Sequence, residues 1–268
     1  METVTDDLVR STAGGRLMGR HVLGVSAIFC AGVDLFWRPV AGWQSLAPLR
    51  HLPHATVLAL LLLVAVLQGA GGIAILAPAG RRRVLRLGAG ALAVAYLVIT
   101  LLTLPALVGS PLVFNSWGNL GEQLSRLAGA VLALVMARAT AARARSTAGQ
   151  VAYWAFGLCV VSFMVEQWVY FPPTVALVPK WLPPGQYFWA IATTVAFGLA
   201  AAALLVRRAA RLAAELLTAM LVIFGVAVWI PILVKQPHVA TNWSECAVTF
   251  SIAGAAWVVS DALRQQLL

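Results

Sequence analysis

Long apolar runs, separated by short polar or basic segments, dominate the chain from residue 21 onward. At a rise of 1.5 Å per residue, about 20 apolar residues in a helix cross a hydrocarbon core about 30 Å thick. Eight runs are close to this length, so the pattern predicts eight transmembrane helices. Their ranges are 21–38, 55–77, 86–107, 120–139, 151–171, 186–206, 210–233 and 243–263.

The composition agrees with a membrane protein. Of the 268 residues, 61% are hydrophobic and only 10% are charged, whereas about a quarter of the residues in a soluble domain are charged. The mean hydropathy is +0.88. We therefore expect an all-α integral membrane protein that lies in a lipid bilayer.

Lysine and arginine residues are distributed unevenly between the two ends of the predicted spans. With a cytoplasmic N-terminus, fourteen of the nineteen lie on the cytoplasmic side, many of them within 81–86, 138–145 and 207–211. The positive-inside rule then predicts a multi-pass protein of a cell inner membrane with both termini in the cytoplasm. A nucleic-acid partner is not expected, because the arginines form short loops and no continuous basic face.

The chain contains an internal repeat. Residues 72–105 and 198–231 align at an offset of 125 to 126, and both carry an arginine cluster with R-x-x-R-L and a proline that closes the following span. We divide the chain into a cytoplasmic segment (1–20), a first four-helix repeat (21–145) and a second one (146–268). Because each repeat has an even number of spans, the prediction is two four-helix bundles in parallel orientation.

Four short segments of the second repeat form a distinctive set. They are V-P-K-W-L-P at 178–183, the two arginines at 207–208, W-I-P at 229–231 and N-W at 242–243. In these segments the chain resembles the DoxX-like family of four-helix membrane proteins, and the first repeat is similar to a more diverged copy. The resemblance implies a left-handed four-helix bundle per repeat and a loose association with thiol or sulfur redox reactions. It implies no set of catalytic residues.

Four acidic residues are predicted to lie at one depth, near the outer ends of the spans: Asp34, Glu122, Glu166 and Glu245. A carboxylate near hydrocarbon is costly unless it is paired, protonated or hydrated, so each is a candidate functional residue.

The two acids of the first repeat each have an arginine four residues later. Asp34 precedes Arg38, and Glu122 precedes Arg126. Because residues four apart lie on one face of a helix, the spacing predicts two structural ion pairs. Such pairs can hold helices together inside a bundle.

The two acids of the second repeat have no cation within one turn of their own helix. Their partners must come from other helices, or the acids must be partly protonated. A protonated acid can relay protons or donate a hydrogen bond to a quinone that enters from the lipid. This interpretation predicts one buried polar or quinone site. Its members would be Glu166, Gln167, Glu245, Glu122 and Arg126.

Other polar residues point less clearly to a site. No metal is expected, because His51, His54 and His238 lie in outer loops without acidic or cysteine neighbours. No cofactor has a sequence signature, and a quinone is the one that the acids suggest. The spacing predicts that Glu215 and Asp261 form surface pairs with arginines on their own helices.

The predicted outer face is rich in tryptophan and proline. Eight of the ten tryptophans lie there, and proline stiffens loops by fixing φ. We expect a structured cap that binds a membrane or periplasmic protein partner. Three functions stay open: a non-catalytic subunit or scaffold of a membrane complex, a quinone-binding component of an oxidoreductase, and a transporter of a small solute or lipid.

Overall fold

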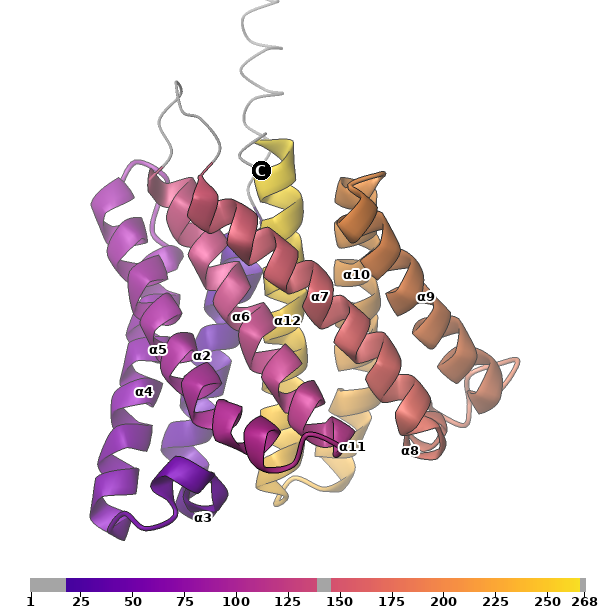
Figure 1. The fold of residues 1–268 in the computed structure, drawn as a ribbon, viewed down its shortest axis with the longest axis horizontal. Helices are drawn as coiled ribbons and strands as arrows, with labels where there is room; N and C mark the ends of the chain where they lie inside the picture. Colours follow the sequence, from indigo (N-terminus) through magenta and orange to yellow (C-terminus); the bar gives the residue numbers. More distant parts are fainter. Residues whose placement is uncertain (1–17, 139–145, 266–268) are drawn as a thin grey trace, which may run out of the picture.

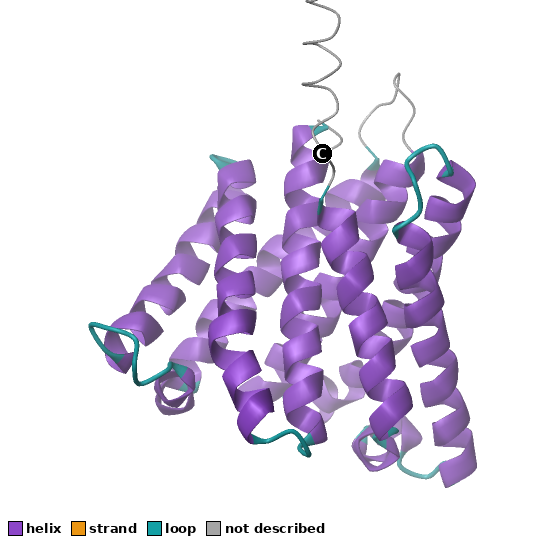
Figure 2. Ribbon diagram, turned by 180° about the vertical axis from the view of Figure 1, so that it is seen from behind, coloured by secondary structure: helices purple, strands orange, loops and turns teal. Residues whose placement is uncertain are grey.

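A computed structural model describes residues 18–138 and 146–265 of the chain, and these residues form helices and no strand (Figures 1 and 2). Eight helical segments in this part are long and apolar enough to cross a membrane. This confirms the predicted all-α membrane fold and its eight spans. The segments are α2 (Gly19–Trp37), α4 (His54–Ile75), α5 (Arg82–Gly109), α6 (Phe114–Arg138), α7 (Thr147–Val169), α9 (Gln186–Val206), α10 to α11 (Ala210–Lys235) and α12 (Ala240–Arg264). Most of the predicted N-terminal segment 1–20 and residues 139–145 lie outside the described residues.

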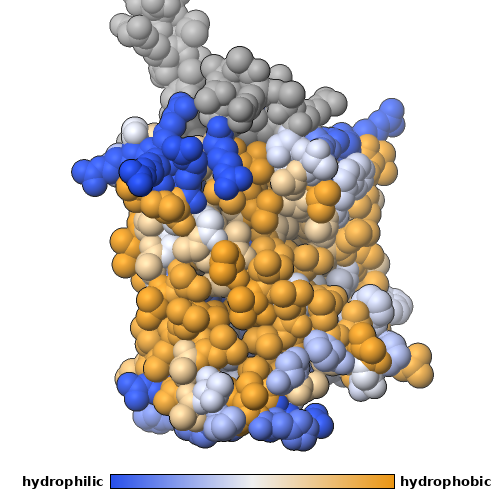
Figure 3. Space-filling view, turned by 60° about the vertical axis from the view of Figure 1, so that its left-hand side comes forward, coloured by the Kyte–Doolittle hydropathy of each residue, from blue (hydrophilic) through white to orange (hydrophobic). Residues whose placement is uncertain are grey.

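The two ends of the bundle differ in character. One end carries the arginine loops, which form a hydrophilic belt above an apolar band in Figure 3. At the other end, short helices follow the first span of each repeat (Figure 1). They are α3 (Val40–Ser45) with the 3-10 turn η1 (Ala47–Leu49), and α8 (Phe171–Leu177).

A tryptophan–proline contact recurs at the end of the bundle opposite the arginine loops. The indole Nε1 of Trp117 donates to the carbonyl of Pro111 at 3.0 Å, and that of Trp243 donates to Pro237 at 2.9 Å. The two contacts are 126 residues apart, which is the offset of the sequence repeat. In both repeats the loop before the last span is therefore fixed to the start of that span.

The eight spans form a single bundle. Each span packs against the next along the chain, α6 packs against α7, and α12 returns to pack against α2. Helices α6 and α12 also meet at the centre, whereas α2 and α6 make little contact. The last helix of each repeat therefore packs against the first helix of the other repeat.

Glycine allows the close approach of α2 and α12. A Cβ atom at Gly254 would lie 2.6 Å from the backbone nitrogen of Leu23, and one at Gly19 would lie 2.5 Å from that of Val258. Lipid provides no hydrophobic force that drives helices together, so close van der Waals contact between small residues stabilises such interfaces. The contact between α2 and α12 therefore depends on glycine in both helices.

Two acids near the arginine end have different environments. Arg211 and Glu215 form the predicted pair, with 2.9 Å between Nε and Oε1, and it is the only ion pair within residues 18–138 and 146–265. Asp261 is 2% exposed, and its Oδ2 accepts a hydrogen bond from the backbone nitrogen of Gly19 at 2.9 Å. The predicted surface pair with Arg264 is wrong, because Asp261 instead satisfies one of the free N–H groups at the start of α2.

The seventh span is interrupted near the end that lies opposite the arginine loops. Helix α10 (Ala210–Phe224) continues into a π-helical turn, η2 (Gly225–Trp229), and then into α11 (Ile230–Lys235). Pro231 has no N–H group and cannot continue the α-helical hydrogen bonds. Pro105, its counterpart in the first repeat, lies inside the continuous helix α5. The π turn therefore belongs to the second repeat, and such turns are frequent at functional sites.

Candidate functional site

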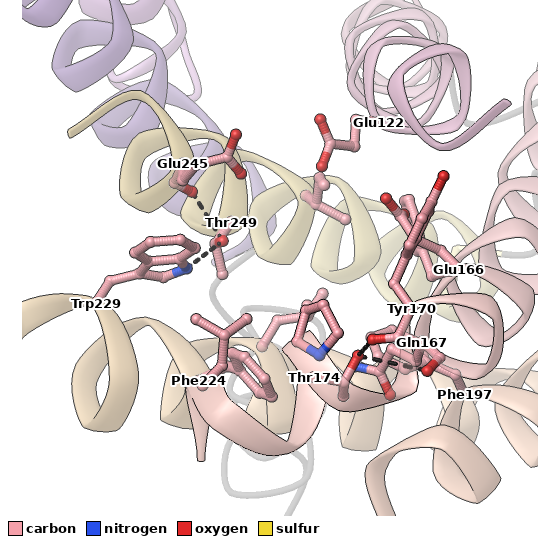
Figure 4. A pocket seen from close by; sticks show the side chains of 15 residues that line it. Glu122, Glu166, Gln167, Tyr170, Thr174, Phe197, Phe224, Trp229, Glu245 and Thr249 are labelled. Atoms are coloured by element: carbon pink, nitrogen blue, oxygen red, sulfur yellow. Dashed lines mark hydrogen bonds between the residues drawn. The ribbon is translucent and has the colours of Figure 1, made fainter. Parts of the chain in front are cut away.

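A pocket of about 290 Å³ lies among helices of the second repeat, at the end of the bundle opposite the arginine loops (Figure 4). Three acids from three helices line it: Glu122 of α6, Glu166 of α7 and Glu245 of α12. The structure thus brings together three of the four acids that were predicted at one depth. Asp34 of α2 is not among the residues that line the pocket.

The rest of the wall is mainly apolar and aromatic. Its five rings come from α7 and the residue that ends it, and from α9, α10 and η2. They are Phe163, Tyr170, Phe197, Phe224 and Trp229. None of the described residues that line the pocket is lysine, arginine or histidine. The pocket therefore combines negative charge with aromatic faces and contains no cation of its own.

The π turn supplies one wall of this pocket. Nε1 of Trp229 donates to Oγ1 of Thr249 at 2.9 Å, and Thr249 donates in turn to the backbone carbonyl of Glu245 at 2.8 Å (Figure 4). The interrupted seventh span is thereby linked to α12 one turn from an acid.

Gln167, a predicted member of the site, also lines the pocket. Its Oε1 accepts hydrogen bonds from Thr194 at 3.0 Å and from Thr193 at 3.3 Å, both on α9. Within the described part of the chain, no acceptor contacts its Nε2. The amide is therefore held by α9 and keeps a free donor.

Sequence reasoning missed three polar residues of the pocket, Tyr170, Thr174 and Thr249. Tyr170 and Thr249 each lie four positions after a candidate acid, Glu166 or Glu245, and so lie on the same helical face. This spacing was a usable signal.

The predicted ion pair between Asp34 and Arg38 is wrong. Arg38 ends α2 in the left-handed conformation, with φ of 45°, so the i,i+4 spacing of a continuing helix does not apply to it. Its Nε donates to the carbonyl of Leu35 at 3.3 Å. Oδ2 of Asp34 accepts instead from Nε2 of Gln68 on α4, at 3.4 Å.

The predicted ion pair between Glu122 and Arg126 is also wrong. The guanidinium of Arg126 extends into the first repeat, where Nη2 donates to Oε1 of Gln68 at 3.0 Å and Nη1 donates to Oε1 of Gln123 at 2.8 Å. It also lies 4.4 Å from the centre of the Tyr96 ring. These amide and aromatic groups bind the cation away from the pocket, so Arg126 does not belong to the site that was predicted to include it.

Comparison with known proteins gives no match. No protein-family model, curated protein or solved structure is similar to this chain. The resemblance to the DoxX-like family therefore stays a prediction from the sequence. In the described residues, no group of three or more histidine, cysteine, aspartate or glutamate side chains could hold a metal ion.

Proposed function

We propose that this protein is a non-catalytic membrane protein that binds a small, lipophilic organic cation in the pocket and exchanges it for protons. The observation that carries this proposal is the lining of the pocket: three carboxylates and five aromatic rings, without a basic side chain.

The negative charges of the pocket need a cation or protons to neutralise them. Ionised carboxylates in apolar surroundings are costly unless a cation or a proton neutralises them. Arg126 is the nearest candidate by sequence, but it is bound to Gln68 and Gln123. A cationic ligand and protons would therefore compete for Glu122, Glu166 and Glu245.

The aromatic walls suit the same class of ligand. Ring faces attract ammonium groups, and the attraction grows when the pair is removed from water. The volume of about 290 Å³ lies just below the range typical of small-molecule sites, about 300–1,000 Å³. The ligand should be compact, with apolar substituents around one positive charge.

Benzyltrimethylammonium and neopentylbenzene make a matched pair of probes, because a carbon replaces the charged nitrogen in an otherwise similar shape. We expect saturable binding of the cation to the purified protein in nanodiscs, measured by calorimetry, and weaker binding of the neutral compound. Glu166→Gln and Glu245→Gln should each reduce the affinity about tenfold, which corresponds to about 1.4 kcal/mol.

Glu215→Gln is the matched control, because Glu215 pairs with Arg211 and does not line the pocket. It should bind the cation as well as the unchanged protein. Equal affinity for both probes, or unchanged binding after both pocket substitutions, would refute the proposal.

A quinone is a second candidate ligand, and the free Nε2 of Gln167 favours it. That amide could donate a hydrogen bond to a quinone carbonyl. Purification in mild detergent, followed by mass spectrometry of the bound small molecules, separates the two candidates. A quinone that the unchanged protein retains and the Gln167→Leu variant loses would favour the redox-linked function.

A protein partner on the outer face is a separate proposal. The Trp–Pro contacts fix the outer loops, and Trp168 and Trp181 are each 70% exposed there. Partner binding predicts that a membrane or periplasmic protein co-purifies and that Trp181→Ala releases it. If nothing co-purifies with the unchanged protein, these rings serve the bilayer interface alone.

A further inference from the structure

One face of α7 is tied to the start of α6 on both sides of Glu166. Oγ of Ser162 donates to the carbonyl of Trp117 at 3.4 Å, and the backbone nitrogen of Asn115 donates to the hydroxyl of Tyr170 at 3.1 Å. Ser162 and Tyr170 are one turn before and one turn after Glu166, so all three side chains face α6. The acid therefore lies between two tethers that hold its helix against α6.

The carboxylate of Glu166 rests directly on α6 at Gly118. A Cβ atom at Gly118 would lie 2.6 Å from Oε1, 2.7 Å from Cδ and 2.9 Å from Oε2 of Glu166. All three distances are below 3.0 Å, which is closer than Cβ atoms approach other heavy atoms in folded proteins. A methyl group at position 118 would therefore force the carboxylate to move.

The backbone of α6 gives no other reason for glycine at this position. Gly118 lies inside the helix, and its φ is not in the left-handed region that favours glycine. Glycine is a poorer helix former than alanine. The space that Gly118 leaves is therefore used by the acid of the neighbouring helix.

We propose that Gly118 is a positioning residue that sets the place of the Glu166 carboxylate in the wall of the pocket, and thereby sets the affinity of the pocket for its cationic ligand. The statement about affinity rests on the proposed function. The statement about the position of the carboxylate rests on the packing alone.

The first test is the Gly118→Ala variant, with benzyltrimethylammonium as the probe. We expect affinity to fall about tenfold, while the melting temperature in detergent stays close to that of the unchanged protein, since alanine favours the helix. Gly90→Ala is the matched control, because a Cβ at that helical glycine of α5 would meet nothing within 4 Å. It should leave both quantities unchanged.

A shorter acid should relieve the collision. Glu166→Asp alone is expected to weaken binding, because the carboxylate retreats from its place. In the Gly118→Ala background the same change should cost little or restore part of the affinity. Independent, additive losses would overturn the inference, as would full affinity in Gly118→Ala.

Infrared spectroscopy tests the position of the acid without any ligand. The bands of the Glu166 carboxyl group are identified by their loss in Glu166→Gln, and they should shift in Gly118→Ala and stay in place in Gly90→Ala. If the unchanged protein binds no cation, the proposed function fails and the infrared result still decides the role of Gly118. Unshifted bands in Gly118→Ala would overturn that role.

Discussion

Replacing Gln68 tests whether its hydrogen bonds to Arg126 and Asp34 stabilise the buried charges of the first repeat. The side chain is fully buried in α4 and bridges two charged groups, since it accepts from Arg126 at 3.0 Å and donates to Asp34 at 3.4 Å. Gln68→Leu keeps a similar volume and removes both contacts. The substitution leaves a buried guanidinium with one partner fewer, and its Nε already has none.

The expected loss of stability follows from these contacts. A hydrogen bond to a charged group contributes about 1.5–3 kcal/mol in soluble proteins, whereas bonds between membrane helices average about 0.6 and reach about 1.7 kcal/mol. The buried charge and the two lost contacts place Gln68→Leu near the upper values, at about 2 kcal/mol. That is about a 30-fold change in the unfolding equilibrium.

Reversible unfolding in mixed micelles, with increasing fractions of a denaturing detergent, measures this change. Arg38→Ala is the informative control, because the sequence pairs Arg38 with Asp34 and the structure does not. It should leave the free energy of unfolding nearly unchanged. Adding Arg126→Leu to Gln68→Leu should cost less than the sum of the single changes, because the unpaired charge is then gone. A stable Gln68→Leu variant, or an Arg38→Ala variant as unstable as it, would refute the reasoning.

Three further predictions follow from the structure. Cation binding should weaken as pH falls, because protonation removes the negative charge of the pocket; a flat binding profile from pH 5 to 8 would count against proton exchange. Gly254→Val should reduce the free energy of unfolding by at least the ~1–3 kcal/mol typical of overpacking, because the atom 2.6 Å from its Cβ belongs to the backbone of Leu23 and cannot rotate away. A cysteine at Ser110 should react with a membrane-impermeant maleimide in intact cells, whereas one at Gly80, in the arginine loop, should react only after permeabilisation; the reverse pattern would invert the proposed orientation.

The helices could be predicted because length and hydropathy alone decide a transmembrane span. Their packing order could not, because it depends on which face of each helix carries small residues. Gly19 and Gly254 bring α2 against α12 at backbone contact, and nothing in the spacing of either glycine names its partner helix.

The candidate site, too, could be predicted only in part from the sequence. The depth of Glu122, Glu166 and Glu245 could be read from the ends of their spans, and the pocket does gather them. The partners of the charged side chains could not be predicted, because the i,i+4 rule assumes that the helix continues and that no group on another helix binds the cation instead. Arg38 leaves the helix at a left-handed residue, and Arg126 meets the amides of the first repeat.

The exchange of end helices between the repeats has a consequence for biosynthesis. Helix α12 follows the other seven spans along the chain, yet it covers the face of α2, the first of them, that carries Gly19 and Leu23. During synthesis that face of α2 has no helix packed against it until the eighth span has been inserted. A chain interrupted before α12 would leave that face of α2 exposed to lipid, while α4 still packs against α2. The contact between the first and the last span can therefore form only after the whole bundle has been inserted.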